Sequence, residues 1–146
     1  MNILVSSCLL GTKCRYDGSC ALCNELLKLK DGYNFISVCP EVLSGLPTPR
    51  EPCEIFKNRV VTKSGKDFTS NFIDGANQTL EIAKSFDCKY AILKERSPSC
   101  GNSKIYNGKF SDKLVYGTGV TASLLAENGI IIFSENEIDK FVSFVK

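Results

Sequence analysis

The sequence contains no histidine among its 146 residues. This absence excludes a Ser-His-Asp triad, a Cys-His protease pair and any metal site ligated by histidine. A net charge of +2 also gives no reason to expect a protein that coats nucleic acid. We therefore expect any acid–base chemistry to fall on a carboxylate and any soft metal site to be built from thiolates.

Long apolar runs are also missing. No stretch approaches the ~18 apolar residues of a membrane-spanning helix. The short apolar run that starts at Ile3 lacks both the basic residues and the length of a secretory signal. We therefore expect a cytoplasmic protein with no membrane partner. In that compartment thiols stay reduced, so cysteines pack, bind metals or catalyse more often than they form disulfides.

What the chain does have is cysteine, eight residues in all. This is about 5% of the sequence, below the roughly 8–10% that marks a disulfide scaffold. A length of 146 residues favours one domain, and we expect a single domain over residues 1–146.

Four short and nearly continuous apolar runs are typical of strands that are buried on both faces of a parallel sheet. They are Ile3–Ser6, Phe35–Val38, Tyr90–Leu93 and Ile130–Phe133. Helical patterns separate them, and alternating strands and helices indicate right-handed βαβ units. The prediction is an α/β fold: three-layer, Rossmann-like, with a mostly parallel sheet of about four main strands and helices on both faces.

The helical patterns differ in strength. The last one begins with a capping box, Ser134 and Glu137, and a further pattern over residues 120–127 stops at Asn128-Gly129. The apolar positions of the other predicted helices are Leu22, Leu26 and Leu29, then Ile73, Ala76, Leu80 and Ala83, and finally Ile138, Phe141, Val142 and Val145. Small hairpins are expected at residues 55–62 and 104–110, the second around Asn107-Gly108.

A cysteine stands at or just beyond the end of each of the first three predicted strands: Cys8, Cys39 and Cys100. The carboxyl ends of parallel strands share one edge of the sheet, where ligands bind in such folds. A single free cysteine is usually a small buried hydrophobe. Three at equivalent strand ends favour a shared site instead.

The other five cysteines give weaker signals. Cys20 and Cys23 form a CxxC pair, but it lies too far beyond the first strand for a thioredoxin-like motif. We predict packing or no assigned role for Cys14, Cys20, Cys23, Cys53 and Cys88.

Three thiolates without histidine leave two kinds of metal centre open. Zinc prefers four ligands in a closed structural site. Iron–sulfur clusters suit widely spaced thiolates, and a four-iron cluster on three cysteines leaves one iron open as a Lewis acid. The spacing alone does not separate these options.

Three longer motifs point to a family. The segments SSCLLG with CRYDG, CPEVLSGLPTPREPCEI and LKERSPSCG resemble the thiouracil desulfidase family in the same order along the chain. The resemblance implies a [4Fe-4S] cluster on three cysteines and removal of sulfur from thiouracil, giving uracil and sulfide. By motif, the cluster ligands fall on Cys8, Cys39 and Cys100. The acid–base carboxylate falls on Glu41, and an assisting serine falls on Ser97.

The resulting hypothesis is hydrolytic cleavage of the C=S bond of thiouracil or a thiolated nucleoside. The substrate sulfur would bind the open iron while Glu41 activates water or carries protons. Arg50 and Asp17 are candidates for binding the pyrimidine edge. Each residue also has a plainer interpretation: Glu41 as an exposed loop carboxylate, Arg50 as a salt bridge within the proline-rich loop, and Asp17 or Ser97 as a turn residue.

Alternatives from other functional classes remain at this point. The chain could be a non-catalytic or sulfide-carrying iron–sulfur protein, or a zinc or thiol-redox module around Cys8, Cys14, Cys20 and Cys23. A basic stretch with Lys57, Arg59, Lys63 and Lys66 keeps thiolated transfer RNA open as a partner. Such a run is more often a solvated surface, so a free base or nucleoside is favoured.

Overall fold

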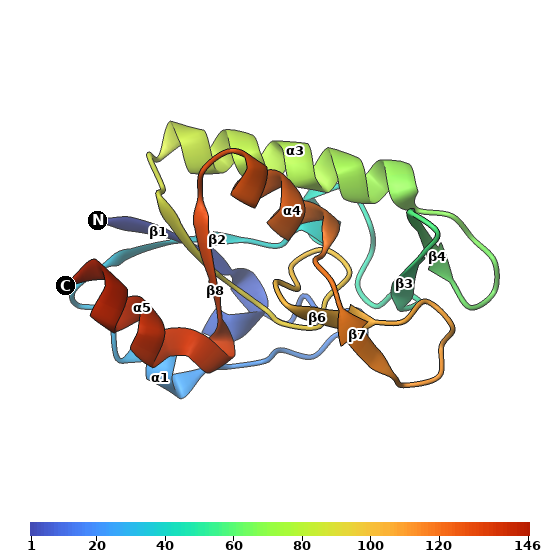
Figure 1. Ribbon diagram of the computed structural model, residues 1–146, viewed down its shortest axis with the longest axis horizontal. Coiled ribbons are helices and arrows are strands. Elements are labelled where there is room, and N and C mark those ends of the chain that lie inside the picture. The colour runs from blue at the N-terminus through green and yellow to red at the C-terminus, as the bar shows by residue number, and fades with distance from the viewer.

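The computed structural model describes all residues from Met1 to Lys146. Its centre is a four-stranded parallel sheet with the order β2-β1-β5-β8 (Figure 1). The strands are β1 (Asn2–Ser6), β2 (Asn34–Val38), β5 (Tyr90–Leu93) and β8 (Ile131–Ser134). Each lies within one residue of an apolar run in the sequence, which confirms the predicted sheet.

The register of the sheet aligns the carboxyl ends of its strands. Ser6 of β1 pairs with Val38 of β2, and Val5 of β1 pairs with Ile92 of β5. The segments that follow these three strands therefore leave the sheet at the same edge, as the sequence pattern predicted.

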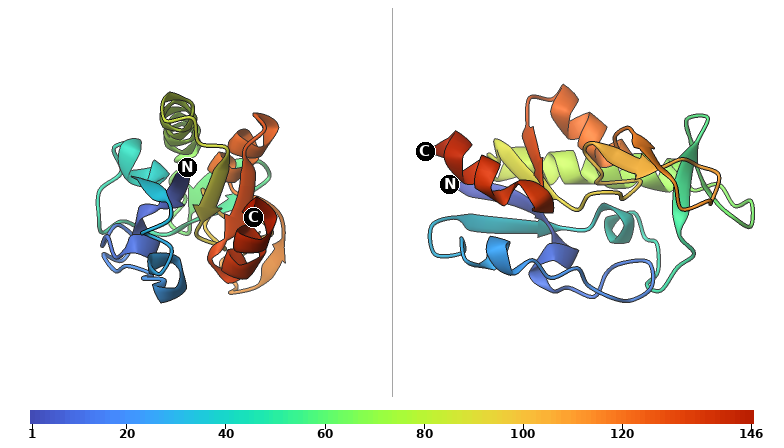
Figure 2. Two further views of the ribbon diagram at one scale, coloured as in Figure 1. Left: turned by 90° about the vertical axis from the view of Figure 1, so that its left-hand side faces the viewer. Right: turned by 60° about the horizontal axis from the view of Figure 1, so that its bottom comes forward.

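Helices cover both faces of the sheet, which confirms the three-layer prediction. Helices α3 (Thr69–Ser85) and α4 (Val120–Glu127) lie on one face, while α1 (Asn24–Leu27) and α5 (Ile138–Val145) lie on the other (Figures 1 and 2). Strand side chains alternate between the two layers. Ile3 packs in the same core cluster as Leu26 and Phe141, whereas Leu4 packs with Leu125 of α4.

Two helical predictions were partly wrong. Helix α1 has only four residues, and Leu22, which precedes it, is 50% exposed. In α3, Ile73 is also 50% exposed, while Phe72 is buried. The buried face of α3 includes Phe72 rather than Ile73, because the Phe72 ring packs beneath the β3–β4 hairpin. It contacts Leu46, Cys53 and Val60 there.

The end of the chain folds as the sequence predicts. Ser134 and Glu137 form the capping box, and a short 3₁₀ turn (Glu135–Glu137) then leads into α5. Ile138 and Phe141 are buried, and Val142 and Val145 pack against the same core cluster.

Two hairpins extend beyond the sheet. The first joins β3 (Cys53–Phe56) to β4 (Arg59–Thr62), as expected. The second joins β6 (Lys104–Tyr106) to β7 (Leu114–Tyr116), so the expected range of 104–110 was too short. Asn107-Gly108 does not form a two-residue turn, because the backbone N–H groups of Gly108 and Phe110 bind the Glu54 carboxylate of β3.

None of the helices combines the length and the apolar character needed to cross a membrane.

Candidate active site

A cavity of about 570 Å³ lies at the carboxyl edge of the sheet. Segments that follow β1, β2 and β5 line it, together with residues of the two hairpins. Six of the residues singled out in the sequence meet there: Cys8, Cys39, Glu41, Arg50, Ser97 and Cys100. The structure therefore brings together side chains that lie up to 92 residues apart in the chain.

Cys8 lies in a 3₁₀ turn (Ser7–Leu10) that follows β1 directly. The turn ends at Gly11, whose φ of 98° is a left-handed conformation that glycine adopts without strain. The carbonyl oxygen of Cys8 accepts hydrogen bonds from the backbone N–H groups of Gly11 and Ala21. These contacts fix Cys8 at the strand end, with its side chain on the cavity wall.

Cys39 is the N-cap residue of a short helix, α2 (Pro40–Leu43), which the sequence analysis missed. Proline is favoured at the first position of a helix, and a carboxylate in the first turn is favoured by the helix dipole. Pro40 and Glu41 were therefore the available signal. Glu41 belongs to this helix and is not an exposed loop carboxylate.

Cys100 lies in a tight turn after β5. The Ser97 hydroxyl oxygen accepts hydrogen bonds from the backbone N–H groups of Ser99 and Cys100, both at 3.0 Å. Behind the turn, the buried Ser99 and Thr121 hydroxyls lie 2.7 Å apart. Ser97 therefore shapes the turn that presents Cys100, and its own hydroxyl hydrogen stays available to another acceptor.

Burial keeps Cys8 and Cys100 protonated as free thiols. It raises the pKa of Cys8 to about 11, Cys39 adds to the rise, and the cations of Lys94 and Arg15 oppose it. Burial likewise raises the pKa of Cys100. A metal centre bound here must therefore displace thiol protons, and nearby cations would favour the resulting thiolates.

The arrangement of the thiols discriminates between metal centres. No three Cys, Asp or Glu side chains converge closely enough to hold a single metal ion. Cys20 and Cys23 do not line the cavity, so the structure does not assemble the zinc site considered from the sequence. Ligands of a polynuclear cluster stand farther apart, because inorganic sulfide and several irons fill the space between them. Three separated thiols on one cavity wall fit such a cluster.

Glu41 and Arg50 form an ion pair inside the cavity. Arg50 Nε donates to Glu41 Oε1 over 3.3 Å, and the two side chains are only 7% and 18% exposed, respectively. Burial raises the pKa of Glu41, although the Arg50 guanidinium opposes the shift. A carboxyl group with a raised pKa holds a proton more readily than an exposed one, which suits it to general acid–base catalysis.

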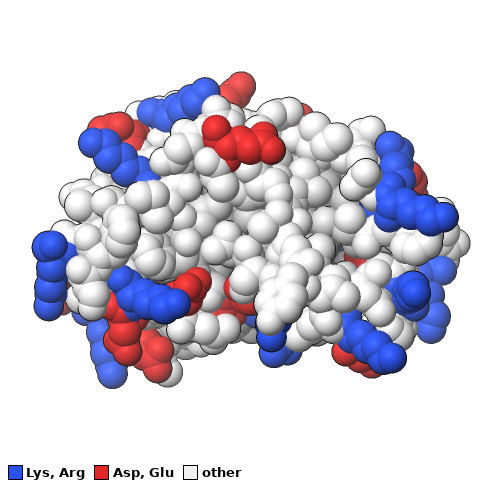
Figure 3. Space-filling model, viewed as in Figure 1, with Lys and Arg blue, Asp and Glu red and all other residues white.

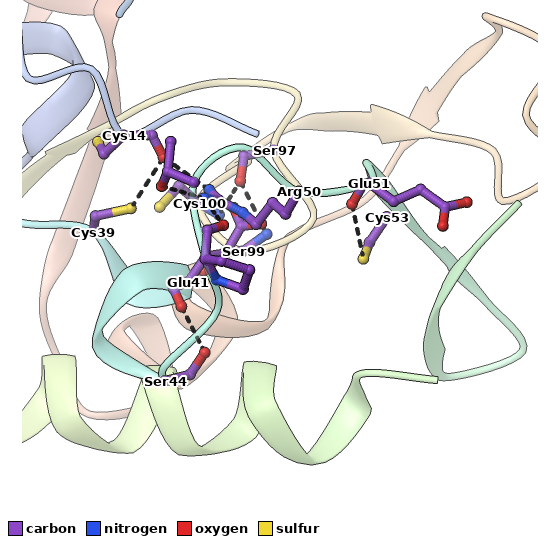
Figure 4. Close-up of polar contacts among 12 residues, drawn as sticks. Cys14, Cys39, Glu41, Ser44, Arg50, Glu51, Cys53, Ser97, Ser99 and Cys100 are labelled. Atoms are coloured by element: carbon purple, nitrogen blue, oxygen red, sulfur yellow. Dashed lines mark hydrogen bonds and ion pairs between the residues drawn. The ribbon is translucent and has the colours of Figure 1, made fainter. Parts of the chain in front are cut away.

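Arg50 makes further hydrogen bonds to the protein. Its Nη1 donates to the Pro47 carbonyl and to Thr48 Oγ1, and its Nη2 donates to the Cys14 carbonyl over 2.9 Å (Figure 4). Most of its donors are thus used within the molecule. The contacts indicate that Arg50 positions Glu41 and joins two loops, which agrees with the plainer interpretation of this residue.

Comparison with known proteins now assigns the family. Residues 3–137 match the family model described as 2-thiouracil desulfurase. The chain belongs to the 2-thiouracil desulfurase family. It is 47% identical over 147 residues to the "Uncharacterized protein YbbK" of Bacillus subtilis (strain 168), covering 94% of this chain and 97% of that protein.

A solved structure supports the same assignment. The fold matches that of the "[4Fe-4S]-dependent thiouracil desulfidase TudS" with a TM-score of 0.93 and 42% sequence identity, over 99% of this chain and 97% of that one. The expected family and α/β fold are therefore both confirmed.

Not every residue predicted for this desulfurase-family site belongs to the cavity. Asp17 does not line it. Its carboxylate accepts hydrogen bonds from the backbone N–H and the hydroxyl of Ser19, and these bonds lower the pKa of Asp17. Asp17 is a turn-capping residue in this structure, and its proposed contact with substrate is not supported.

Several cavity residues of this family member were not assigned to the site from the sequence. Cys14, Cys53 and Glu95 all line the same space. The signal for Glu95 was its position shortly after β5, in the same motif as Cys100. Cys14 begins the CRYDG motif, and Cys53 lies in the motif that begins with Cys39.

Proposed function

We propose that this chain is a [4Fe-4S]-dependent desulfidase that removes sulfur from thiouracil or a closely related thiolated pyrimidine. The proposal rests on one observation above all: Cys8, Cys39, Cys100 and Glu41 line a single cavity. They do so in a chain that shares its fold and 42% of its sequence with a thiouracil desulfidase. In this proposal, residues 1–146 form one desulfidase domain.

Cys8, Cys39 and Cys100 would hold the cluster. When bound by three thiolates, such a cluster supplies an iron with no protein ligand, a Lewis acid suited to a soft thiocarbonyl sulfur. The cysteines follow three adjacent strands, so the rigid sheet fixes their separation. Lys94 and Arg15 favour the charged form of Cys8, which is the form that binds metal.

Glu41 would hold and move the protons of the reaction. Its position in the first turn of α2 brings it within two residues of Cys39, and Arg50 holds one carboxylate oxygen. The other oxygen, Oε2, has no partner in the protein and can accept a proton from water or return one to a ring nitrogen. Ser97 can donate its free hydroxyl hydrogen toward the same space.

The cavity suits a small molecule. Its volume of about 570 Å³ lies within the usual range of small-ligand sites. Most of the face shown in Figure 3 carries no charged side chain, and charges of both signs lie around its edge. Arg59 of the basic stretch is also paired with Asp67 at 2.8 Å. These features favour a free base or nucleoside over folded RNA, and the need for reduced thiols favours the cytoplasm.

The decisive experiment is anaerobic reconstitution followed by iron and sulfide analysis and a thiouracil assay. We expect about four irons per chain and the release of uracil and sulfide. Sulfide bound without turnover would instead indicate a sulfide carrier. Salt-sensitive binding of transfer RNA would overturn the preference for a small substrate.

Three variants test the ligands. Cys8→Ser, Cys39→Ser and Cys100→Ser should each lose the cluster or make it labile to oxygen. Cys88→Ser is the matched control, because Cys88 is as buried as Cys100 but lies at the other end of β5. An intact cluster in all three ligand variants would contradict the assignment.

A further inference from the structure

The cavity contains a fourth buried thiol, Cys14, that the proposed function does not use. Cys14 lies between the 3₁₀ turn that carries Cys8 and helix α1, and it is 7% exposed. The Cys39 thiol donates to the Cys14 carbonyl oxygen over 3.9 Å (Figure 4), and both cysteines line the same cavity and pack in the same core cluster. Two cysteines from separate segments of the chain are therefore neighbours.

We propose that Cys14 and Cys39 form a reversible dithiol–disulfide pair that closes when no cluster is bound and withholds Cys39 from cluster binding. The second half of this statement rests on the proposed function, because it takes Cys39 as a cluster ligand. The first half rests only on the contact between Cys14 and Cys39 and their shared cavity.

A low-molecular-weight disulfide supplies the oxidising equivalents. The Cys39 thiolate attacks one sulfur of that disulfide, forms a mixed disulfide and releases one small thiol. The Cys14 sulfur then attacks Cys39, forms the internal disulfide and releases the second small thiol. Two electrons and two protons pass from the cysteine pair to the reagent, which is reduced to two thiols. A dithiol reductant reverses the reaction.

The surroundings select this pair from the thiols in the cavity. Cys39 is partly exposed and is therefore open to attack, whereas Cys8 and Cys100 are both buried. Cys14 belongs to a segment without helix or strand, and hydrogen bonds from its N–H to Thr12 and from Arg50 to its carbonyl hold that segment next to Cys39. Cys100 lies in a separate turn after β5, which hydrogen bonds to Ser97 hold.

Closure would also protect the site. A partly exposed thiol that has lost its metal is open to oxidation beyond sulfenic acid, which is irreversible. A disulfide prevents this further oxidation, and small cellular thiols can reduce it back to two thiols. Cluster loading would then depend on prior reduction of Cys14 and Cys39.

The test uses the full-length chain without cluster, treated with glutathione disulfide. Trypsin places each cysteine of interest in a separate peptide: Cys14 in Cys14-Arg15, Cys39 in residues 31–50, Cys8 in residues 1–13 and Cys100 in residues 97–104. We expect a mass loss of about 2 Da, from the two hydrogens of one disulfide, and a crosslink between Cys14-Arg15 and residues 31–50. The oxidised protein should take up iron and sulfide only after reduction with a dithiol.

Two variants make the test specific. Cys14→Ser should form no internal crosslink and should carry glutathione on Cys39, and Cys14→Ala repeats the test with a second side chain. Cys53→Ser is the matched control, because Cys53 lines the same cavity but should not alter the crosslink.

The results separate the two parts of the proposal. A crosslink between any other pair, or none at all, overturns the Cys14–Cys39 pair. If the expected crosslink forms but cluster loading is unaffected, the closure has no effect on loading and Cys39 is not a cluster ligand.

Discussion

Glu41 is held by a single ion pair within the protein, so its substitution should separate chemistry from structure. In Glu41→Gln the amide can still accept the hydrogen bond from Arg50 Nε, and the local packing is preserved. The amide cannot exchange a proton, so turnover of thiouracil should fall by about 10²–10⁴-fold, the usual contribution of general acid–base catalysis. Iron content and the cluster absorbance should remain at the wild-type level.

The control for this prediction is Glu51→Gln. Glu51 is exposed and binds Ser64 outside the cavity, so turnover should not change. Near wild-type activity in Glu41→Gln would show that another group carries the proton, and Ser97 would then be the next residue to test.

At the scale of elements, the strands could be predicted from sequence because continuous apolar runs require burial on both faces. The short helix α2 was missed, because four residues carry no helical period and only Pro40 and Glu41 signalled its start. Which face of α3 is buried depends on tertiary contacts. Phe72 rather than Ile73 is buried, because the β3–β4 hairpin packs against the side of the helix that carries Phe72. Local pattern determines which elements form, and long-range packing determines how they are rotated.

The contact between α2 and α3 depends on Gly75. A β-carbon at this position would lie 2.1 Å from the Pro40 carbonyl oxygen. Replacing glycine by alanine in the middle of a helix usually stabilises by about 0.5–1 kcal/mol. Here Gly75→Ala should instead destabilise by about 1–3 kcal/mol, because α2 must move away. The movement displaces Cys39 and Glu41, so cluster loading should also decline.

Urea unfolding and iron content measure the two effects of Gly75→Ala. Asn77→Ala, on the exposed side of the same helix, is the control and should retain wild-type stability or gain slightly from its better helix propensity. If Gly75→Ala were as stable as Asn77→Ala and loaded normally, the close approach of the two helices would be contradicted.

At the scale of the whole molecule, the convergence of Cys8, Cys39 and Cys100 could be predicted from sequence. The parallel sheet places the three strand ends at one edge, whatever the loops do. The side-chain contacts within the site could not be predicted. Arg50 reaches the Cys14 carbonyl across 36 residues, and only the folded loops bring them together. Asp17 illustrates the opposite case, because its local turn holds it outside the cavity.

Glu95 ties distant parts of the molecule together and should govern its stability in acid. Its Oε1 accepts hydrogen bonds from the backbone N–H groups of Asn102, Ser103 and Lys104 at 2.9–3.1 Å. Its own N–H donates to Glu135, beyond β8. Burial alone would raise the pKa of Glu95, but the hydrogen bonds from residues 102–104 lower it overall.

Because the folded-state pKa of Glu95 lies below its unfolded value, the carboxylate contributes stability above about pH 4.3, the usual glutamate value. That contribution is lost as the pH falls through the folded-state pKa. Glu95→Gln should lower the free energy of unfolding by about 2 kcal/mol near neutrality, the scale of hydrogen bonds to a charged group. The difference from wild type should shrink in acid.

Urea unfolding of the cluster-free protein across this pH range measures the difference in the free energy of unfolding. Glu127→Gln is the control, because Glu127 is an exposed carboxylate without hydrogen bonds. A difference that stayed constant down to about pH 3 would show that the charge of Glu95 does not stabilise the fold.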